Sequence, residues 1–194
     1  MPVSRNKWIE FKSTFYITVS CMILLLPIKL VFWWIFAAVI HELSHIVSIH
    51  LCGGVVRSVS VGSTGAVIEA DITDSKKEAL CALAGPVGGF LILFVRKQFP
   101  VLAVCGMVQS IFNLIPIYPT DGGRVFLYLL SRIPDPLVAK WVQIIVTRAI
   151  FAGLILLGSI ALFSGLGPMP LVVVFLFFHR KRKIPCKARQ QIVQ

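Results

Sequence analysis

Two histidines and a glutamate stand together in an apolar part of this chain, in the order His41-Glu42-Leu43-Ser44-His45. Residues four apart on a helix share one face, so the two imidazoles can bind a single metal ion. A glutamate beside the first histidine is the usual general base in metal-assisted peptide hydrolysis. The residues from 30 to 40 are all apolar, and ionisable groups placed at membrane depth mark function. The pattern therefore indicates a metal-dependent hydrolytic site inside a membrane.

A catalytic zinc site takes three protein ligands and keeps one position open for water. Among the eight acidic residues, Asp121 alone lies just beyond an apolar span in a segment rich in proline and glycine. A carboxylate in that position needs a partner that offsets its desolvation. We therefore expect one zinc ion per chain, with Asp121 as the third ligand beside the two histidines. Soluble metzincins have a third histidine after the H-E-x-x-H motif, and His50 stands one position away from the place of that histidine. We therefore expect His50 to be a helix-end residue and not a ligand.

The composition indicates an integral membrane protein. Hydrophobic residues make up 57% of the chain and charged residues 14%, with a mean hydropathy of +0.89, whereas soluble domains carry roughly 25% charged residues. The length favours a single domain over residues 1–194 without a second sizeable one. We expect its catalytic core at about residues 30–124, followed by C-terminal helices and a basic tail over residues 125–194.

Nine of the nineteen lysines and arginines lie near the two ends of the chain. The formal net charge is +11, and six of the nineteen lysines and arginines stand between residues 180 and 189. Basic ends that flank apolar spans are typical of cytoplasmic loops, so we expect no nucleic-acid partner and a tail that lies on anionic lipid. The five cysteines are scattered without a C-x-x-C pair, which favours packing roles over a disulfide framework.

The elements that must position the site are apolar helices and one hairpin. The sequence predicts an all-α membrane protein, a polytopic bundle of about six transmembrane helices at residues 14–27, 30–50, 79–95, 100–115, 137–163 and 169–178. The last segment is short for a full crossing. Between the second and third spans, residues 55–71 alternate around a Gly-Ser-Thr-Gly turn and predict a small membrane-associated β-hairpin. Ser75 and Glu78 resemble a capping box, and the small residues around Pro86 allow close helix packing or a break.

The charge distribution also suggests an orientation. With both basic termini in the cytoplasm, six spans are consistent with most loop charges, although Arg96-Lys97 runs against the positive-inside rule. The second and fourth spans then run in the same direction, and His41, His45 and Asp121 all fall near their cytoplasmic ends. This arrangement favours a shared site.

Taken together, the motifs resemble the site-2 protease family of intramembrane zinc metalloproteases. The resemblance covers about residues 30–124 and rests on the H-E-x-x-H helix, the hairpin, Ala84-Gly85-Pro86, and a segment in which Asn113, Pro116 and Asp121-Gly122-Gly123 have the family's spacing. It implies that His41, His45 and Asp121 bind zinc, that Glu42 activates a water molecule, and that Asn113 helps to position the substrate or its reacting carbonyl. Gly89 stands where the family often has asparagine, and Thr120 replaces a commonly apolar residue.

The short chain and the lack of a PDZ or CBS module most resemble the stage IV sporulation protein FB-like branch. The resemblance implies a multi-pass protease of a bacterial cell membrane that cleaves a transmembrane or membrane-associated protein and releases a regulator, with pro-sigma factor processing as one such reaction. Regulatory membrane proteins and further copies of the chain are partners that it allows. On the residues alone, a metal-ion or proton transporter that uses the same His/carboxylate cluster stays open, and so does a proteolytically silent scaffold.

Overall fold

The computed structural model describes residues 8–62 and 65–164 of the chain. It divides into two compact units, residues Met1–Ile115 and Pro116–Gln194. The sixth expected span (169–178) and the basic segment at 180–189 lie outside the described residues.

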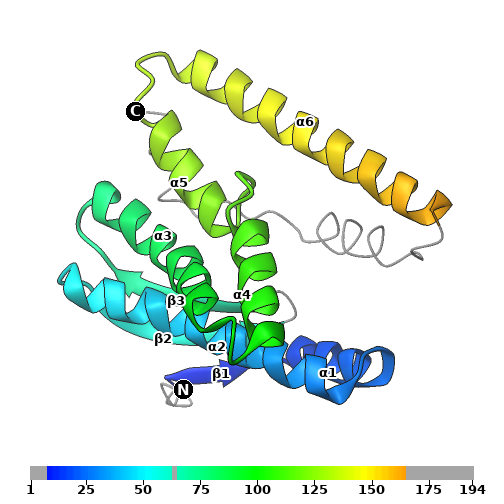
Figure 1. Ribbon diagram of the computed structural model, residues 1–194. Helices are drawn as coiled ribbons and strands as arrows, with labels where there is room; N and C mark the ends of the chain where they lie inside the picture. Colours follow the sequence, from blue (N-terminus) through cyan, green and yellow to red (C-terminus); the bar gives the residue numbers. More distant parts are fainter. Residues whose placement is uncertain (1–7, 63–64, 165–194) are drawn as a thin grey trace, which may run out of the picture. The chain divides into compact units, whose positions relative to one another are not determined.

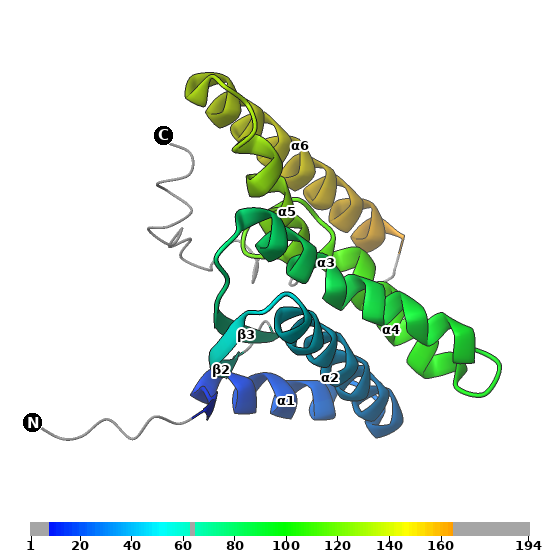
Figure 2. The ribbon, with the colours of Figure 1, turned by 90° about the vertical axis from the view of Figure 1, so that its left-hand side faces the viewer.

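The first unit is built on four apolar helices, of which three pack against one another in pairs. These are α1 (Ser13–Leu25), α2 (Ile28–Leu51), α3 (Ser75–Leu91), which continues as a 3-10 turn η1 (Ile92–Val95), and α4 (Pro100–Asn113) (Figure 1). Helices α2, α3 and α4 form the packed group (Figure 2), and its core is a cluster of buried apolar residues around Ala37 of α2 and Leu102 of α4. These helices lie where the first four spans were expected, and α2 and α3 with η1 are long enough to cross a membrane, whereas α1 and α4 are shorter.

The N-cap of helix α3 is Asp74, one residue before Ser75, where the capping box was expected. The side chain of Asp74 accepts a hydrogen bond from the Lys76 N–H at 3.0 Å, so the capping residue is Asp74 and not Ser75. An aspartate satisfies the free N–H groups of a first turn as well as a serine does. The helix then runs without a break through Pro86.

Glycines of α3 let it approach its neighbours closely. A Cβ atom at Gly88 would lie 1.9 Å from Ser44 Oγ, and one at Gly89 would lie 2.1 Å from Ser110 Oγ and 3.0 Å from the Gly106 carbonyl oxygen. Only glycine fits at these distances, so the small residues serve close packing on α2 and α4. A larger side chain at Gly89 would therefore meet α4.

The expected hairpin is present and is part of a three-stranded sheet. Strands β2 (Val55–Gly62) and β3 (Gly65–Asp71) pair antiparallel, and β1 (Ile9–Phe11) pairs with β2 in parallel to give the order β1-β2-β3. The addition of β1 is not predicted from the sequence, because its three residues lie in a polar, basic lead and pair with a distant segment. Within the described residues, the free edge of the sheet beyond β3 has no neighbouring strand.

Over residues 116–164, the described part of the second unit, the chain forms two helices, α5 (Asp121–Leu130) and α6 (Pro136–Phe163). Leu127 and Leu130 of α5 are buried together with Ala139 of α6. Helix α6 confirms the fifth expected span. Helix α5 is absent from the prediction, which treated its first residues as a connecting segment.

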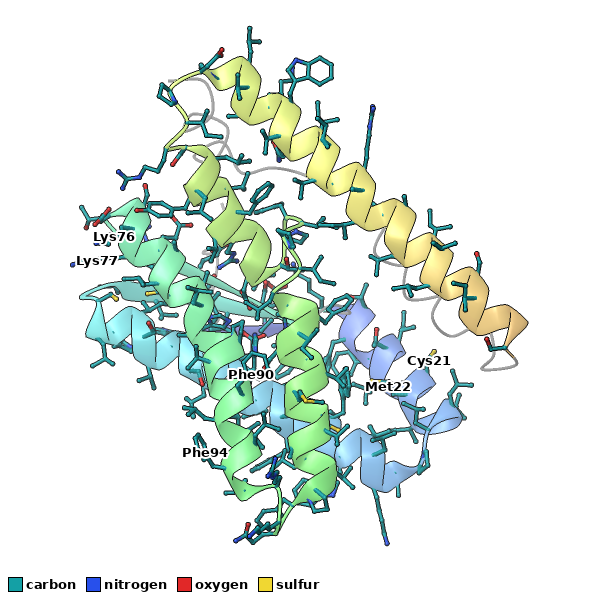
Figure 3. All side chains as sticks on the ribbon, turned by 45° about the horizontal axis from the view of Figure 1, so that its top comes forward. Cys21, Met22, Lys76, Lys77, Phe90 and Phe94 are labelled. Carbon is teal, nitrogen blue, oxygen red and sulfur yellow. The ribbon has the colours of Figure 1, made fainter. Side chains whose placement is uncertain are left out.

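Among the residues that the structure describes, three helices are long and apolar enough to cross a membrane: α2, α3 together with η1, and α6 over residues Pro136–Ile160. Helices α1 and α4 are apolar but shorter. Figure 3 shows how the two ends of α3 differ: Lys76 and Lys77 stand at its start, and Phe90 and Phe94 lie toward the other end. Phe94 is 84% exposed, as expected of a side chain in contact with lipid. The mostly helical fold with a small sheet confirms the predicted class.

Candidate metal centre

The two histidines of α2 lie one helical turn apart and converge on one point. Both side chains are buried, and their Nε2 atoms are 3.3 Å apart. Two nitrogen ligands of a tetrahedral zinc ion, each at 2.0–2.1 Å from the metal, are separated by about 3.3–3.4 Å. The spacing of the imidazole pair therefore fits two corners of a zinc tetrahedron.

The proton on His45 is positioned by the main chain of the neighbouring helix. His45 Nδ1 lies 2.8 Å from the carbonyl oxygen of Cys81 in α3. A carbonyl only accepts hydrogen bonds, so Nδ1 carries the proton and Nε2 presents its lone pair. A metal-binding histidine commonly has this kind of partner on its second nitrogen, because the bond fixes both the tautomer and the ring orientation.

Gly85 of α3 leaves room for the two imidazoles. A Cβ atom at this position would lie 2.2 Å from His45 Nε2 and 2.6 Å from His41 Nε2. Any other side chain would occupy the space beside the two ligand nitrogens. The Ala-Gly-Pro motif therefore has a direct role at the histidine pair, beyond the helix packing that its small residues suggest.

Glu42 points to the hairpin, away from the histidine face of α2. Its Oε1 accepts a hydrogen bond from the backbone N–H of Ala66, at 3.3 Å, at the start of β3. A Cβ atom at Gly65 would lie 3.6 Å from the same oxygen. The carboxylate is half-buried. The hairpin and the H-E-x-x-H helix are thus joined through the residue expected to act as the base.

The remaining expected site residues lie at helix ends. Asn113 is the last residue of α4 and is half-buried. In the second unit, Asp121 is the first residue of α5 and is buried. The N-cap Thr120 accepts a hydrogen bond from the Gly123 N–H at 3.1 Å and donates one to the Ile117 carbonyl at 2.8 Å, so the backbone that carries Asp121 is held from both sides. A carboxylate is also favoured at a helix N-terminus.

Sequence reasoning missed the main-chain groups of the site. The Cys81 carbonyl and the Ala66 amide have no side-chain signature, and only contacts between elements reveal them. Gly85 had a signal in the Ala-Gly-Pro motif, but its closeness to both histidines depends on how α3 packs on α2. His50 is exposed in the last turn of α2, which confirms it as a helix-end residue.

Comparisons with known proteins agree with this chemistry. The family model for peptidase family M50 matches residues 92–157, a range that includes Asn113 and Asp121. A curated zinc metalloprotease of Methanocaldococcus jannaschii is 29% identical over 110 residues, which cover half of this chain and 32% of the relative. Both sequence matches support the M50 family. The chain spans about a third of the length of that relative.

A solved structure has the same fold. The site-2 protease of Methanocaldococcus jannaschii aligns with a TM-score of 0.64 and 24% identity, and the alignment covers 91% of this chain and 92% of that one. At this identity the likeness shows the shared fold alone. The mostly helical architecture with a small sheet is therefore that of a known site-2 protease.

Proposed function

We propose that this chain is a multi-pass intramembrane zinc endopeptidase of the site-2 protease kind, with both units forming one protease domain. The observation that carries the proposal is the histidine pair of α2: two buried imidazoles with ligand nitrogens 3.3 Å apart, one of them fixed in tautomer by a main-chain carbonyl. A packed pair of structural histidines needs neither a cleared space beside its ring nitrogens nor a glutamate directly after the first histidine.

The proposed ligands of one zinc ion per chain are His41, His45 and Asp121. The first two fit the metal by their spacing and their donor atoms. Asp121 is supported by its buried carboxylate at a capped helix start and by its place inside the segment that matches the M50 family. When bound in such a set, zinc polarises a carbonyl group as a Lewis acid and lowers the pKa of water to about 7.

Glu42 is the proposed general base and acid. Its carboxylate takes one proton of the water as the water oxygen attacks the carbonyl carbon, and passes that proton to the leaving amine as the C–N bond breaks. The second proton of the water stays on the new carboxyl group and is lost when that group ionises. The Ala66 N–H donates a hydrogen bond to Oε1 of this carboxylate and orients it. Asn113, at the end of α4, is proposed to orient the substrate or its reacting carbonyl with its amide group.

The proposed substrate is a transmembrane or membrane-associated protein that unwinds near the cut. Peptide bonds within a helix are protected by their own hydrogen bonds, so residues that destabilise a helix favour cleavage. The unwound segment is proposed to add as a strand to the open edge of β3, which has no neighbouring strand in the described part of the chain. Proline or charge along that edge should reduce cleavage while leaving bound zinc unchanged.

The finer assignment rests on the resemblance of the motifs. It supports a sporulation-protease-like enzyme of a bacterial cell membrane, with both termini in the cytoplasm, that releases a regulator such as a processed sigma factor. Control by a regulatory membrane protein and association with further copies of the chain belong to the same proposal.

The test compares wild type with Glu42→Gln in liposomes that contain single-span reporter proteins with Gly-Pro pairs at different depths. Wild type should yield two fragments, whereas Glu42→Gln should leave the reporter uncut and still carry about one zinc per chain by metal analysis. His41→Ala should lose both cleavage and zinc. Ion flux across the liposomes without any cut product would instead support a transporter and contradict the proposal.

A further inference from the structure

The hydrogen bonding of the sheet shows which groups of β3 face its open edge. The Val59 N–H donates to the Trp8 carbonyl, and the Val61 carbonyl accepts from the Lys12 N–H, both at 2.9 Å. The backbone groups of Val59 and Val61 therefore face β1. In an antiparallel pair, opposite residues either bond to each other or both turn away from each other. The partners of these two valines therefore turn toward the open edge.

Those partners are Ile68, opposite Val59, and Ala66, opposite Val61. Backbone groups alternate in direction along a strand, which adds Ala70 to the same set. The open edge of β3 thus offers three N–H and three C=O groups, from Ala66, Ile68 and Ala70. The intervening residues bond to β2.

One of these three edge donors is already engaged by the base. The Ala66 N–H donates to Glu42 Oε1 at 3.3 Å, and this bond joins the open edge of the sheet to α2. A strand that added to β3 would find the Ile68 and Ala70 N–H groups without a partner among residues 8–62 and 65–164, whereas at Ala66 it would meet the Glu42 carboxylate.

We infer that the Ala66 N–H positions the carboxylate of Glu42. For this reason, the stretch of the β3 edge that binds substrate stops at the general base. The inference rests on the proposed function. The Ile68 and Ala70 amides hold the extended substrate, and the Ala66 amide holds the carboxylate in line with them. The peptide carbonyl that would next have accepted a ladder hydrogen bond stays free beside the base. That peptide bond is the one placed for hydrolysis.

The inference also states a substrate requirement. An extended stretch is needed on one side of the cut, where the two edge amides hold the substrate backbone. Bonding through the main chain tolerates many side chains, so recognition on that side depends on the ability to unwind. The other side of the cut makes no ladder bond with β3.

The test places proline at one edge residue of each kind: Ala66, whose N–H bonds to Glu42, and Ile68, whose N–H is assigned to the substrate. Both N–H groups face away from β2, so proline at either position removes no bond of the hairpin. With a reporter that the wild type cleaves, Ala66→Pro should lower kcat roughly tenfold and leave KM within about twofold, because Glu42 Oε1 loses the bond that orients it toward the edge. The matched control Ile68→Pro should raise KM roughly fivefold and leave kcat within about twofold.

A binding measurement separates the two roles without catalysis. The same reporter peptide, labelled with a fluorophore, is titrated with metal-free protein and followed by anisotropy. Ile68→Pro should weaken binding roughly fivefold, and Ala66→Pro should bind as wild type does. Weaker binding with an unchanged kcat in Ala66→Pro would show that the amide serves the substrate and would overturn the inference.

Two further outcomes separate this inference from the proposed function. If neither proline variant changes cleavage while Glu42→Gln abolishes it, the protease assignment stands and the role of Ala66 is wrong. If Glu42→Gln cleaves as wild type does, the proposed function fails first. Should Ala66→Pro not fold, an ester in place of the amide at position 66, introduced as the lactate analogue of alanine, removes the same N–H and must show the same kcat loss.

Discussion

Replacing Gly85 with alanine adds one methyl group beside the histidine pair. Its Cβ would lie 2.2 Å from His45 Nε2, 2.5 Å from His45 Cε1 and 2.6 Å from His41 Nε2, whereas real Cβ atoms essentially never approach a neighbour within 3.0 Å. The His45 ring must therefore move by about 0.8 Å or more, or α3 must shift away from α2.

The size of the effect follows from how little displacement a zinc ligand tolerates. Zinc–nitrogen distances stay within about 0.2 Å of their usual value, so the required movement removes His45 from the ligand set. The same movement stretches the 2.8 Å contact between His45 Nδ1 and the Cys81 carbonyl. Changes around a ligand commonly cost 10–100-fold in metal affinity, and we expect a loss of about 100-fold for Gly85→Ala, with about 1–3 kcal/mol lost from stability by overpacking.

The assay is competition for zinc against a chromophoric chelator, together with thermal unfolding of the purified protein. Gly153→Ala in α6 is the matched control, because a Cβ atom there meets nothing within 4 Å, and it should bind zinc as wild type does. A Gly85→Ala protein that binds zinc within about threefold of wild type would refute the role assigned to this glycine and weaken the placement of the metal between these rings.

Three further predictions address the helices around the site. Gly89→Ala should lower the melting temperature, because its Cβ would lie 2.1 Å from Ser110 Oγ; adding Ser110→Ala should recover most of the loss, and no recovery would disprove the contact. Thr120→Ala should cost about 1 kcal/mol by removing the N-cap of α5 and weaken zinc binding through Asp121, whereas Thr120→Ser should behave as wild type in the same zinc competition. Removing zinc with a chelator should lower the melting temperature by an amount that grows with the starting zinc concentration, since free zinc at 100 times Kd contributes about 2.7 kcal/mol; Glu42→Gln should show the same shift, and a smaller one would make Glu42 a ligand.

The elements with strong local signals were predictable from the sequence. Long apolar runs fixed the positions of α2 and α6, and strict alternation around a glycine turn fixed the hairpin. The spacing of His41 and His45 brings both rings to one side of a helix whatever that helix packs against. These features depend on residues that are close in sequence, so they can be read without the fold.

The elements that depend on distant partners were not predictable. Strand β1 has three residues in a polar lead and is fixed by its pairing with β2. Helix α5 is short, and its start looks like a loop rich in glycine, although Thr120 supplies the cap. At the site, the partners of His45 and Glu42 are main-chain groups of α3 and β3, and a sequence pattern carries no mark of a backbone atom that meets a particular side chain.

The main-chain partner of His45 has a consequence for how this protein responds to mutation. Every residue type offers a carbonyl, so replacing the Cys81 side chain leaves the acceptor in place, and an alanine scan would pass over one of the contacts that prepare the imidazole for a metal. What the contact does require is the register between two helices. A slide of α3 along α2 by a single residue would carry the carbonyl away while every side chain of the motif remained, so the ligand would lose its orientation without any change in the residues that define it.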